Sequence, residues 1–401
     1  MRLAGPVGLD ATPVHIAFSA QGQAAVAFGF VNPNQPGGAQ ASLALLSSGG
    51  RPQQVRPVPH TRQVLALRYL AGSLQILGGT SGGGLACCTA IQTLTLGSRG
   101  FSAPRSLIRG LSGLTVGHLI ASGTGELAVF AANSGVWAAR AAKDGRFGAP
   151  RRLTPAGAAP QSLVATVLHG GGPLVAFTQA PIMSADPPAS PQVMLSTGSA
   201  PGLAPRARSA ATFPAQTAIG PLALAPNPFS PTLGWTQDGA DATGINRSAV
   251  VLAAVGSNLR TRTFAVPGQT AAGLSGAAND SGDELFAWES CDGLPTCQVT
   301  AVSRAARGRF GTARTLGSID AADDPVVALG PHGVGAVAWV AGGQIWFTYR
   351  GSATQRFSTP QRLAGPGPAS GLRLAAGPGG RLLAVWAAGT TRTTLWASQL
   401  G

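Results

Sequence analysis

An apolar phrase ending in an aromatic residue recurs along this chain at a nearly constant interval, and it constrains the fold more than any other feature. From Phe130 onward, the intervals between these aromatics are 47, 58, 53, 51 and 47 residues. The interval from Phe28 to Phe130 is 102 residues, and Ile76 and Leu77 occupy the missing place midway. The seven aromatics are Phe28, Phe130, Phe177, Trp235, Trp288, Trp339 and Trp386. We infer eight repeats of about 50 residues, whose aromatics pack one repeat against the next.

A second recurring phrase marks the end of a repeat. The pattern Phe-x-x-Pro-x-x-Leu occurs at 101–107, 147–153 and 357–363, and at 310–316 with Ala in place of Pro. Between the two phrases lie short apolar segments, rich in β-branched residues and separated by Gly, Asn and Pro. Such segments are typical of short strands. Each repeat is therefore predicted to hold four strands.

The two ends of the chain share a sequence. Residues 2–6 read Arg-Leu-Ala-Gly-Pro, and the same five residues stand at 362–366, where a fourth strand is predicted to end. The last repeat, from Pro368, has only three predicted strands. We therefore expect the N-terminal segment to complete the last sheet, which closes a ring and removes two sheet edges.

Four strands in about 50 residues resemble the repeats of the β-propeller superfamily, over the whole chain. The chain is most similar to exported bacterial propellers with degenerate repeats. It lacks the Gly-His and Trp-Asp pairs of WD40 repeats and the Ser-x-Asp-x-Gly-x-Thr-Trp box of sialidases. The resemblance implies one all-β domain over 1–401, with eight blades of four antiparallel strands; seven blades are the alternative. The expected blades are 10–58, 59–110, 111–157, 158–214, 215–268, 269–319, 320–367, and 368–401 with 1–9.

Composition agrees with this architecture and excludes others. Charged residues make up 10% of the 401 residues, against about 25% in an average protein. The 57 Gly and 31 Pro residues disfavour long helices, and 44% hydrophobic residues are enough for real cores. A helical bundle, a coiled coil and a disordered chain are excluded.

The net charge of +14 raises the question of nucleic-acid binding. All basic residues except Lys143 are arginines, and most fall in or beside the predicted outer strands. There they would be spread around the rim and protect sheet edges from aggregation. Aromatic residues, which stack on bases, are only 6% of the chain. We expect no nucleic-acid partner.

The four cysteines indicate an oxidising compartment. Cys291 and Cys297 flank the turn sequence Asp-Gly-Leu-Pro-Thr and are predicted to form a disulfide between two strand ends. Cys87 and Cys88 are adjacent, and a vicinal disulfide, free thiols and a metal site all stay open. An extracellular or cell-envelope location follows if a disulfide forms.

We expect no membrane span and no signal peptide in the chain as given. Residues 153–185 carry no charge, but Pro155, Pro160, Pro173 and Pro181 would break a spanning helix. Residues 1–6 have no apolar run, so no signal peptide is expected in the chain as given.

The channel-mouth face of the ring is the default binding face, because segments entering the inner strands and long loops meet there. The long loops are predicted at 29–40, 179–191 and 237–248. Polar residues on the entering segments would either bind a small polar molecule, a glycan or a peptide end, or only solvate the mouth. The candidates are Asp10, His60, Arg62, Gln161, Gln216, Gln269, Asp323 and Asp324.

Metal sites are the weaker interpretation. Calcium would find carboxylates at 279–284 or at Asp323 and Asp324, but the first group lacks EF-hand spacing, and a polar hairpin turn is favoured. His15, His60 and His118 could meet near the channel, although scattered hydrogen-bonded histidines are more common. We expect no cofactor, with calcium as the exception to test.

The sequence favours binding over catalysis. A glycosidase needs two carboxylates on one face, and only Asp10, Asp323 and Asp324 are suitably placed for the mouth. We expect a non-catalytic binding or scaffold propeller, with an unidentified protein, peptide or glycan partner. A hydrolase or lyase using the acidic mouth residues is the first alternative, and a structural envelope or assembly component is the second.

Overall fold

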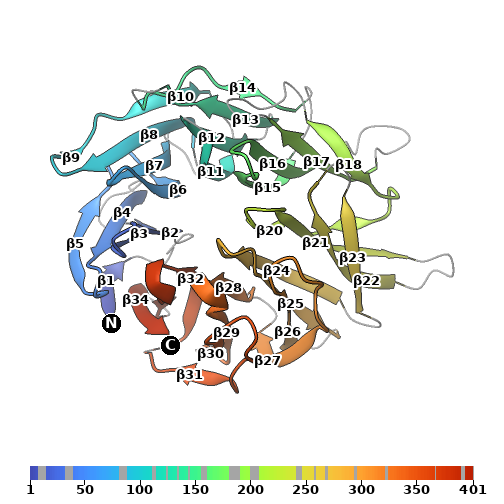
Figure 1. Ribbon diagram of the computed structural model, residues 1–401. Coiled ribbons are helices and arrows are strands. Elements are labelled where there is room, and N and C mark those ends of the chain that lie inside the picture. Colours follow the sequence, from blue (N-terminus) through green and yellow to red (C-terminus); the bar gives the residue numbers. More distant parts are fainter. Residues whose placement is uncertain are drawn as a thin grey trace.

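The computed structural model consists of eight antiparallel sheets arranged in a ring, with the first strand of each sheet nearest the central axis (Figure 1). The structure describes residues 1–7, 15–31, 39–80, 88–110, 114–122, 125–132, 135–142, 145–154, 160–179, 190–198, 207–240, 246–256, 259–266, 270–292, 296–320, 324–365, 367–389 and 393–400. Neighbouring inner strands contact one another around the axis. The sequence-based prediction of an all-β, eight-bladed propeller is confirmed.

Blades 1 to 4 follow the chain from the inside outward. Blade 1 contains β2 (His15–Phe18), β3 (Ala24–Val31), β4 (Ala39–Leu46) and β5 (Pro52–Pro57). Blade 2 contains β6 (Gln63–Leu70), β7 (Ser73–Thr80), β8 (Ala90–Gly97), β9 (Gly100–Phe101) and β10 (Arg105–Arg109). Blade 3 contains β11 (Leu114–Ser122), β12 (Gly125–Ala132), β13 (Gly135–Arg140) and β14 (Arg151–Arg152). Blade 4 contains β15 (Pro160–Val167), β16 (Pro173–Gln179), β17 (Gln192–Thr197) and β18 (Arg208–Thr212).

Blades 5 to 8 continue the ring. Blade 5 contains β19 (Ala218–Ile219), β20 (Ala223–Ala225), β21 (Thr232–Ala240), β22 (Asn246–Ala254) and β23 (Arg260–Val266). Blade 6 contains β24 (Thr270–Ala278), β25 (Glu284–Cys291), β26 (Thr296–Arg304) and β27 (Arg314–Asp320). Blade 7 contains β28 (Val326–Leu329), the 3-10 turn η1 (Pro331–Gly333), β29 (Gly335–Ala341), β30 (Gln344–Arg350) and β31 (Gln361–Leu363). Blade 8 contains β32 (Ala369–Ala376), η2 (Pro378–Gly380), β33 (Leu382–Ala388), β34 (Thr393–Leu400) and β1 (Arg2–Val7).

The antiparallel order defines two ends of every blade. At the entry end the chain comes into the inner strand, and the second and third strands are connected there. At the turn end the first strand joins the second, and the third joins the fourth. The predicted channel mouth is the entry end.

The ring is closed by the N-terminal strand, as the shared sequence predicts. Strand β1 pairs with β34, with Arg2 opposite Trp396 and Val7 opposite Thr393. The amino group of Met1 also donates to the Ala397 carbonyl oxygen at 2.8 Å. Leu3 is buried in a cluster that joins blade 8 to Val26 and Phe28 of blade 1. The two termini therefore lie together in one blade (Figure 1).

Apolar clusters lie between the blades. Each of the eight clusters among the described residues draws its members from two neighbouring blades. All seven recurring aromatics are at most 2% exposed, which confirms their packing role. A Cβ on Gly317 would lie 2.7 Å from Trp339, and one on Gly365 would lie 3.1 Å from Trp386. Glycine in an outer strand thus makes room for the aromatic of the next blade.

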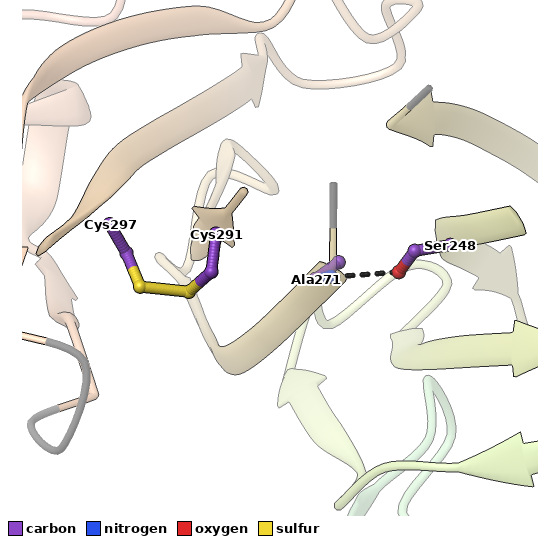
Figure 2. The surroundings of a disulfide bond; sticks show 4 residues. All are labelled: Ser248, Ala271, Cys291 and Cys297. Atoms are coloured by element: carbon purple, nitrogen blue, oxygen red, sulfur yellow. Dashed lines mark hydrogen bonds between the residues drawn. A yellow bond between two sulfur atoms is a disulfide. The ribbon is translucent and has the colours of Figure 1, made fainter. Parts of the chain in front are cut away.

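The predicted disulfide between Cys291 and Cys297 is present and joins β25 to β26 at the entry end of blade 6 (Figure 2). Figure 2 also shows the nearby backbone N–H of Ala271 donating to Ser248 Oγ of blade 5, at 2.7 Å. Cys88 is disulfide-bonded as well. Cys87 lies outside the described residues, so its pairing stays a prediction. Among the described residues, no helix is long and apolar enough to cross a membrane.

Candidate functional site

The predicted channel-mouth residues lie at the entry end, on separate blades. Three of the eight lie outside the described part of the chain: Asp10, Gln269 and Asp323. The other five precede or begin the inner strands of blades 2, 4, 5 and 7: His60, Arg62, Gln161, Gln216 and Asp324. All five are exposed except Arg62, which is half-buried. None of them lines the pockets described below.

Below the mouth, the inner strands carry His15, His118 and Arg373, and the charges of the last two act on His15. Burial and, to a lesser extent, the charges of His118 and Arg373 lower the pKa of His15 to about 4. The ring of His118 is bonded at 3.0 Å through Nε2 to the Leu163 carbonyl oxygen, and burial lowers its pKa. Burial also lowers the pKa of Arg373, which the charge of Asp324 opposes. The neutral histidines belong to the packed interior of the ring.

These histidines do not assemble a metal site within the described residues. His60 is exposed in the turn before β6 and has positive φ, apart from His15 and His118. The three potential ligands that do converge are Glu289 and the two sulfurs of the Cys291–Cys297 disulfide. A disulfide offers no thiolate, so this group is unsuited to a metal.

The hairpin proposed for calcium is cross-linked by its own hydrogen bonds. Asn279 donates from Nδ2 to Asp283 Oδ2 at 2.9 Å, and its Oδ1 accepts from the Asp283 N–H at 2.9 Å. Asp283 Oδ1 accepts from the Ala306 N–H at 2.9 Å. These bonds hold the turn between β24 and β25 against the turn between β26 and β27.

Glu126, at the turn end of blade 3, makes the unfolding free energy depend on pH. Glu126 is 3% exposed, and burial raises its pKa to about 7, while nearby Arg68 opposes the shift. Between pH 4.5 and 7 the folded protein keeps a proton that the unfolded chain has released. The unfolding free energy therefore falls as the pH rises through this range.

Replacing Glu126 by Gln should remove this dependence. We compare the unfolding free energy of E126Q with that of the native protein at pH 4.5 and at pH 8. The difference should shift in favour of E126Q by about 3 kcal/mol between the two pH values. Urea unfolding at both pH values measures the difference. The exposed D280N variant is the control, because it removes a carboxylate at the surface. A stability difference that is the same at both pH values contradicts the assignment.

A pocket lies at the turn end, between blades 5 and 6, and has a volume of about 560 Å³. One wall is the turn between β20 and β21, and a second is the junction of β22 and β23. The third wall is the turn between β26 and β27 of blade 6. Of the described residues, no carboxylate and five arginines line it: Arg260, Arg262, Arg304, Arg307 and Arg309. We call it the arginine pocket.

Two of these arginines are fixed by the protein. Arg304 donates to Glu284 Oε1 at 2.7 Å, and its guanidinium lies 4.9 Å from the ring centre of Phe310. Arg262 donates to the carbonyl oxygens of Phe310 and Gly311, the second at 3.3 Å. Both contacts cross between the strands that form the pocket, so they set its shape.

The other three arginines are exposed and available to a ligand. Arg307 lies over the ring of Phe229, 5.2 Å from its centre, and Phe229 is 45% exposed. Within the described part of the chain, Arg260 and Arg309 have no hydrogen bond or ion pair. The pocket therefore presents guanidinium groups that no carboxylate among the described residues neutralises.

Glu284 holds the pocket together from beneath. It is fully buried, and its Oε1 also accepts from Asn227 Nδ2 and Thr232 Oγ1, each at 3.0 Å. Burial raises the pKa of Glu284, while Arg304 and the two other donors oppose the shift. Because Asn227 and Thr232 belong to blade 5, this carboxylate joins the two blades that form the pocket.

The arginine distribution differs from the one expected from the sequence, where these residues were spread around the rim. Arg260 and Arg262 lie at the start of β23, and 304–309 carries three more arginines in six residues. This local density of arginines in the sequence indicated a cluster. The sequence did not indicate that the turn between the third and fourth strands of blade 6 contacts blade 5.

Comparisons with known proteins add only the fold. No protein family matches the chain, and no curated protein matches its sequence. Among solved structures, the polysaccharide lyase Uly1 is similar with a TM-score of 0.56 at 10% identity, over 100% of both chains. The Dos1 propeller has a TM-score of 0.57 at 9% identity, covering 98% of this chain and 93% of that one. The WD40 domain of SCAP from fission yeast has a TM-score of 0.55 at 9% identity, covering 100% and 97%. The chain is therefore an eight-bladed β-propeller that matches no specific propeller family.

Proposed function

We propose that this protein is a non-catalytic binding propeller that holds an anionic ligand in the arginine pocket. The observation that carries the proposal is the lining, whose described residues include five arginines and no carboxylate. Guanidinium groups bind carboxylate, sulfate and phosphate groups through paired hydrogen bonds. Glu284 pairs with Arg304 only, so the other arginines repel one another, and an anionic ligand relieves this repulsion.

The hydrolase or lyase alternative belongs to the entry end. Its acidic residues are Asp10, Asp323 and Asp324, and the structure describes only Asp324, close to the buried Arg373. The described residues that line the arginine pocket include no carboxylate or histidine that could transfer a proton. Binding without chemistry is therefore the function that this pocket supports.

The structural or assembly alternative would be favoured by a large apolar patch. Among the described residues, the exposed large apolar side chains are dispersed over blades 8, 1, 2 and 5: Met1, Val55, Leu70 and Phe229. They offer no common surface to a partner. We also propose that the protein is located outside the cytoplasm, and the Cys291–Cys297 disulfide supports this location.

A charged ligand and its neutral counterpart test the proposal. Polysaccharide lyases share the fold, so acidic sugars are suitable probes. We expect trigalacturonate to bind in isothermal titration calorimetry, and its methyl ester not to bind. Prolonged incubation should release neither unsaturated products nor reducing ends. Equal affinity for acid and ester, or no binding of the acid, contradicts anion recognition, and product formation contradicts the non-catalytic assignment.

A further inference from the structure

Two more pockets adjoin the arginine pocket. A second pocket of about 490 Å³ lies farther along blades 5 and 6, and Arg262 lines both it and the arginine pocket. A third pocket of about 290 Å³ lies between blades 6 and 7, and Thr312 lines both it and the second. Because Arg262 and Thr312 each line two of them, the three pockets lie next to one another along blade 6, and we call the three together the groove.

The third pocket repeats the construction of the arginine pocket. Arg350 ends the third strand of blade 7, as Arg304 does in blade 6, and lies 5.2 Å from the ring centre of Phe357. Its Nη1 donates to Ser303 Oγ of blade 6 at 2.9 Å. Arg314 and Arg356 are exposed, and neither has a hydrogen bond or ion pair within the described part of the chain. Cationic groups thus stand at both ends of the groove.

The middle of the groove is different in chemistry. Hydroxyl and amide side chains line the second pocket beside the single Arg262: Ser290, Gln298, Thr300, Thr312 and Thr315. Among the residues that the structure describes, no carboxylate lines any of the three pockets. Such side chains exchange hydrogen bonds with hydroxyl groups, whereas the ends attract negative charge.

We propose that the groove binds a linear acidic polysaccharide lengthwise, an inference that rests on the proposed anion-binding function. The arginine pocket and the third pocket hold acidic groups, and the second pocket accommodates the hydroxyl-bearing sugars between them. A single-stranded nucleic acid would need aromatic surfaces for its bases. Among the described lining residues, Phe229 is the one exposed aromatic, and Arg307 lies over its ring.

Chain length is the decisive variable, because a second contact on the same chain adds affinity by effective concentration. We would measure the affinity of oligogalacturonates from three to twelve sugars by calorimetry. The proteins are the native chain, R314Q/R356Q in the third pocket and R307Q/R309Q in the arginine pocket. The exposed R99Q/R105Q pair in blade 2 makes the same charge change outside the groove.

We expect affinity to rise with length and to level off once the oligomer spans the groove. R314Q/R356Q should bind the longest oligomers about tenfold more weakly and the trimer as well as the native protein does. If R314Q/R356Q matches the native protein at every length while R307Q/R309Q is weakened, the lengthwise groove is wrong and the anion pocket stands. If both variants match the native protein, both proposals fall. Equally tight binding of poly-glutamate or single-stranded DNA of equal charge overturns the polysaccharide assignment.

Discussion

Deleting residues 1–7 should lower the melting temperature by about 10 °C. The deletion removes β1, leaves the edge of β34 unpaired, and takes Leu3 out of the cluster between blades 8 and 1. We estimate the loss at about 5 kcal/mol, and in a domain of this size each 1 kcal/mol moves the melting temperature by about 2 °C. Scanning calorimetry on the truncated and full-length proteins makes the comparison.

A peptide of residues 1–7 offers the control for this deletion. Added to the truncated protein, the peptide should restore much of the lost stability by strand addition. The same peptide carrying L3D should not, because Leu3 is buried in the closing cluster. An unchanged melting temperature after truncation would show that β1 does not close the ring.

The R307Q/R309Q variant should bind trigalacturonate about 50-fold more weakly than the native protein. Each substitution removes a charged donor from the arginine pocket and keeps a polar side chain of similar length. A hydrogen bond to a charged group contributes about 1.5 kcal/mol to binding, and less when the group is exposed to solvent. The loss of two such hydrogen bonds weakens binding by roughly 50-fold. Calorimetric titration at constant ionic strength measures it, because salt screens exposed charges.

The R99Q/R105Q pair separates the pocket from the net charge of the protein. Both variants lower the charge by two, but Arg99 and Arg105 lie on blade 2 and are exposed. We expect R99Q/R105Q to bind like the native protein. Equal weakening of both variants would mean that the ligand responds to the overall charge of +14 and not to a site.

The sequence was sufficient for the architecture because one structural position recurs in every blade. Each of the seven aromatics fills the space between two sheets, so its spacing counts the blades directly. The shared Arg-Leu-Ala-Gly segment has a structural reason as well. In blade 7 the segment ends the outer strand β31 and continues to Gly365, where a Cβ would lie 3.1 Å from Trp386. In blade 8 the same segment forms the closing strand β1, whose Leu3 is buried in the cluster between blades 8 and 1.

The arginine pocket could not be predicted in the same way, because it arises from contacts between repeats. Glu284 meets Asn227 across 57 residues of sequence, and Arg262 meets Phe310 across 48. Nothing in the local pattern of either segment indicates the other. General knowledge of propellers directed the prediction to the entry end, where Asp324 and Gln161 lie on different blades. The arginine pocket lies at the opposite end.

A crystal structure with bound hexagalacturonate tests the central claim most directly. The account predicts carboxylates of the ligand within hydrogen-bond distance of Arg260, Arg307 or Arg309, between blades 5 and 6. A ligand bound instead at the entry end, beside Asp324 and Arg373, would contradict the arginine pocket and return the function to the channel mouth.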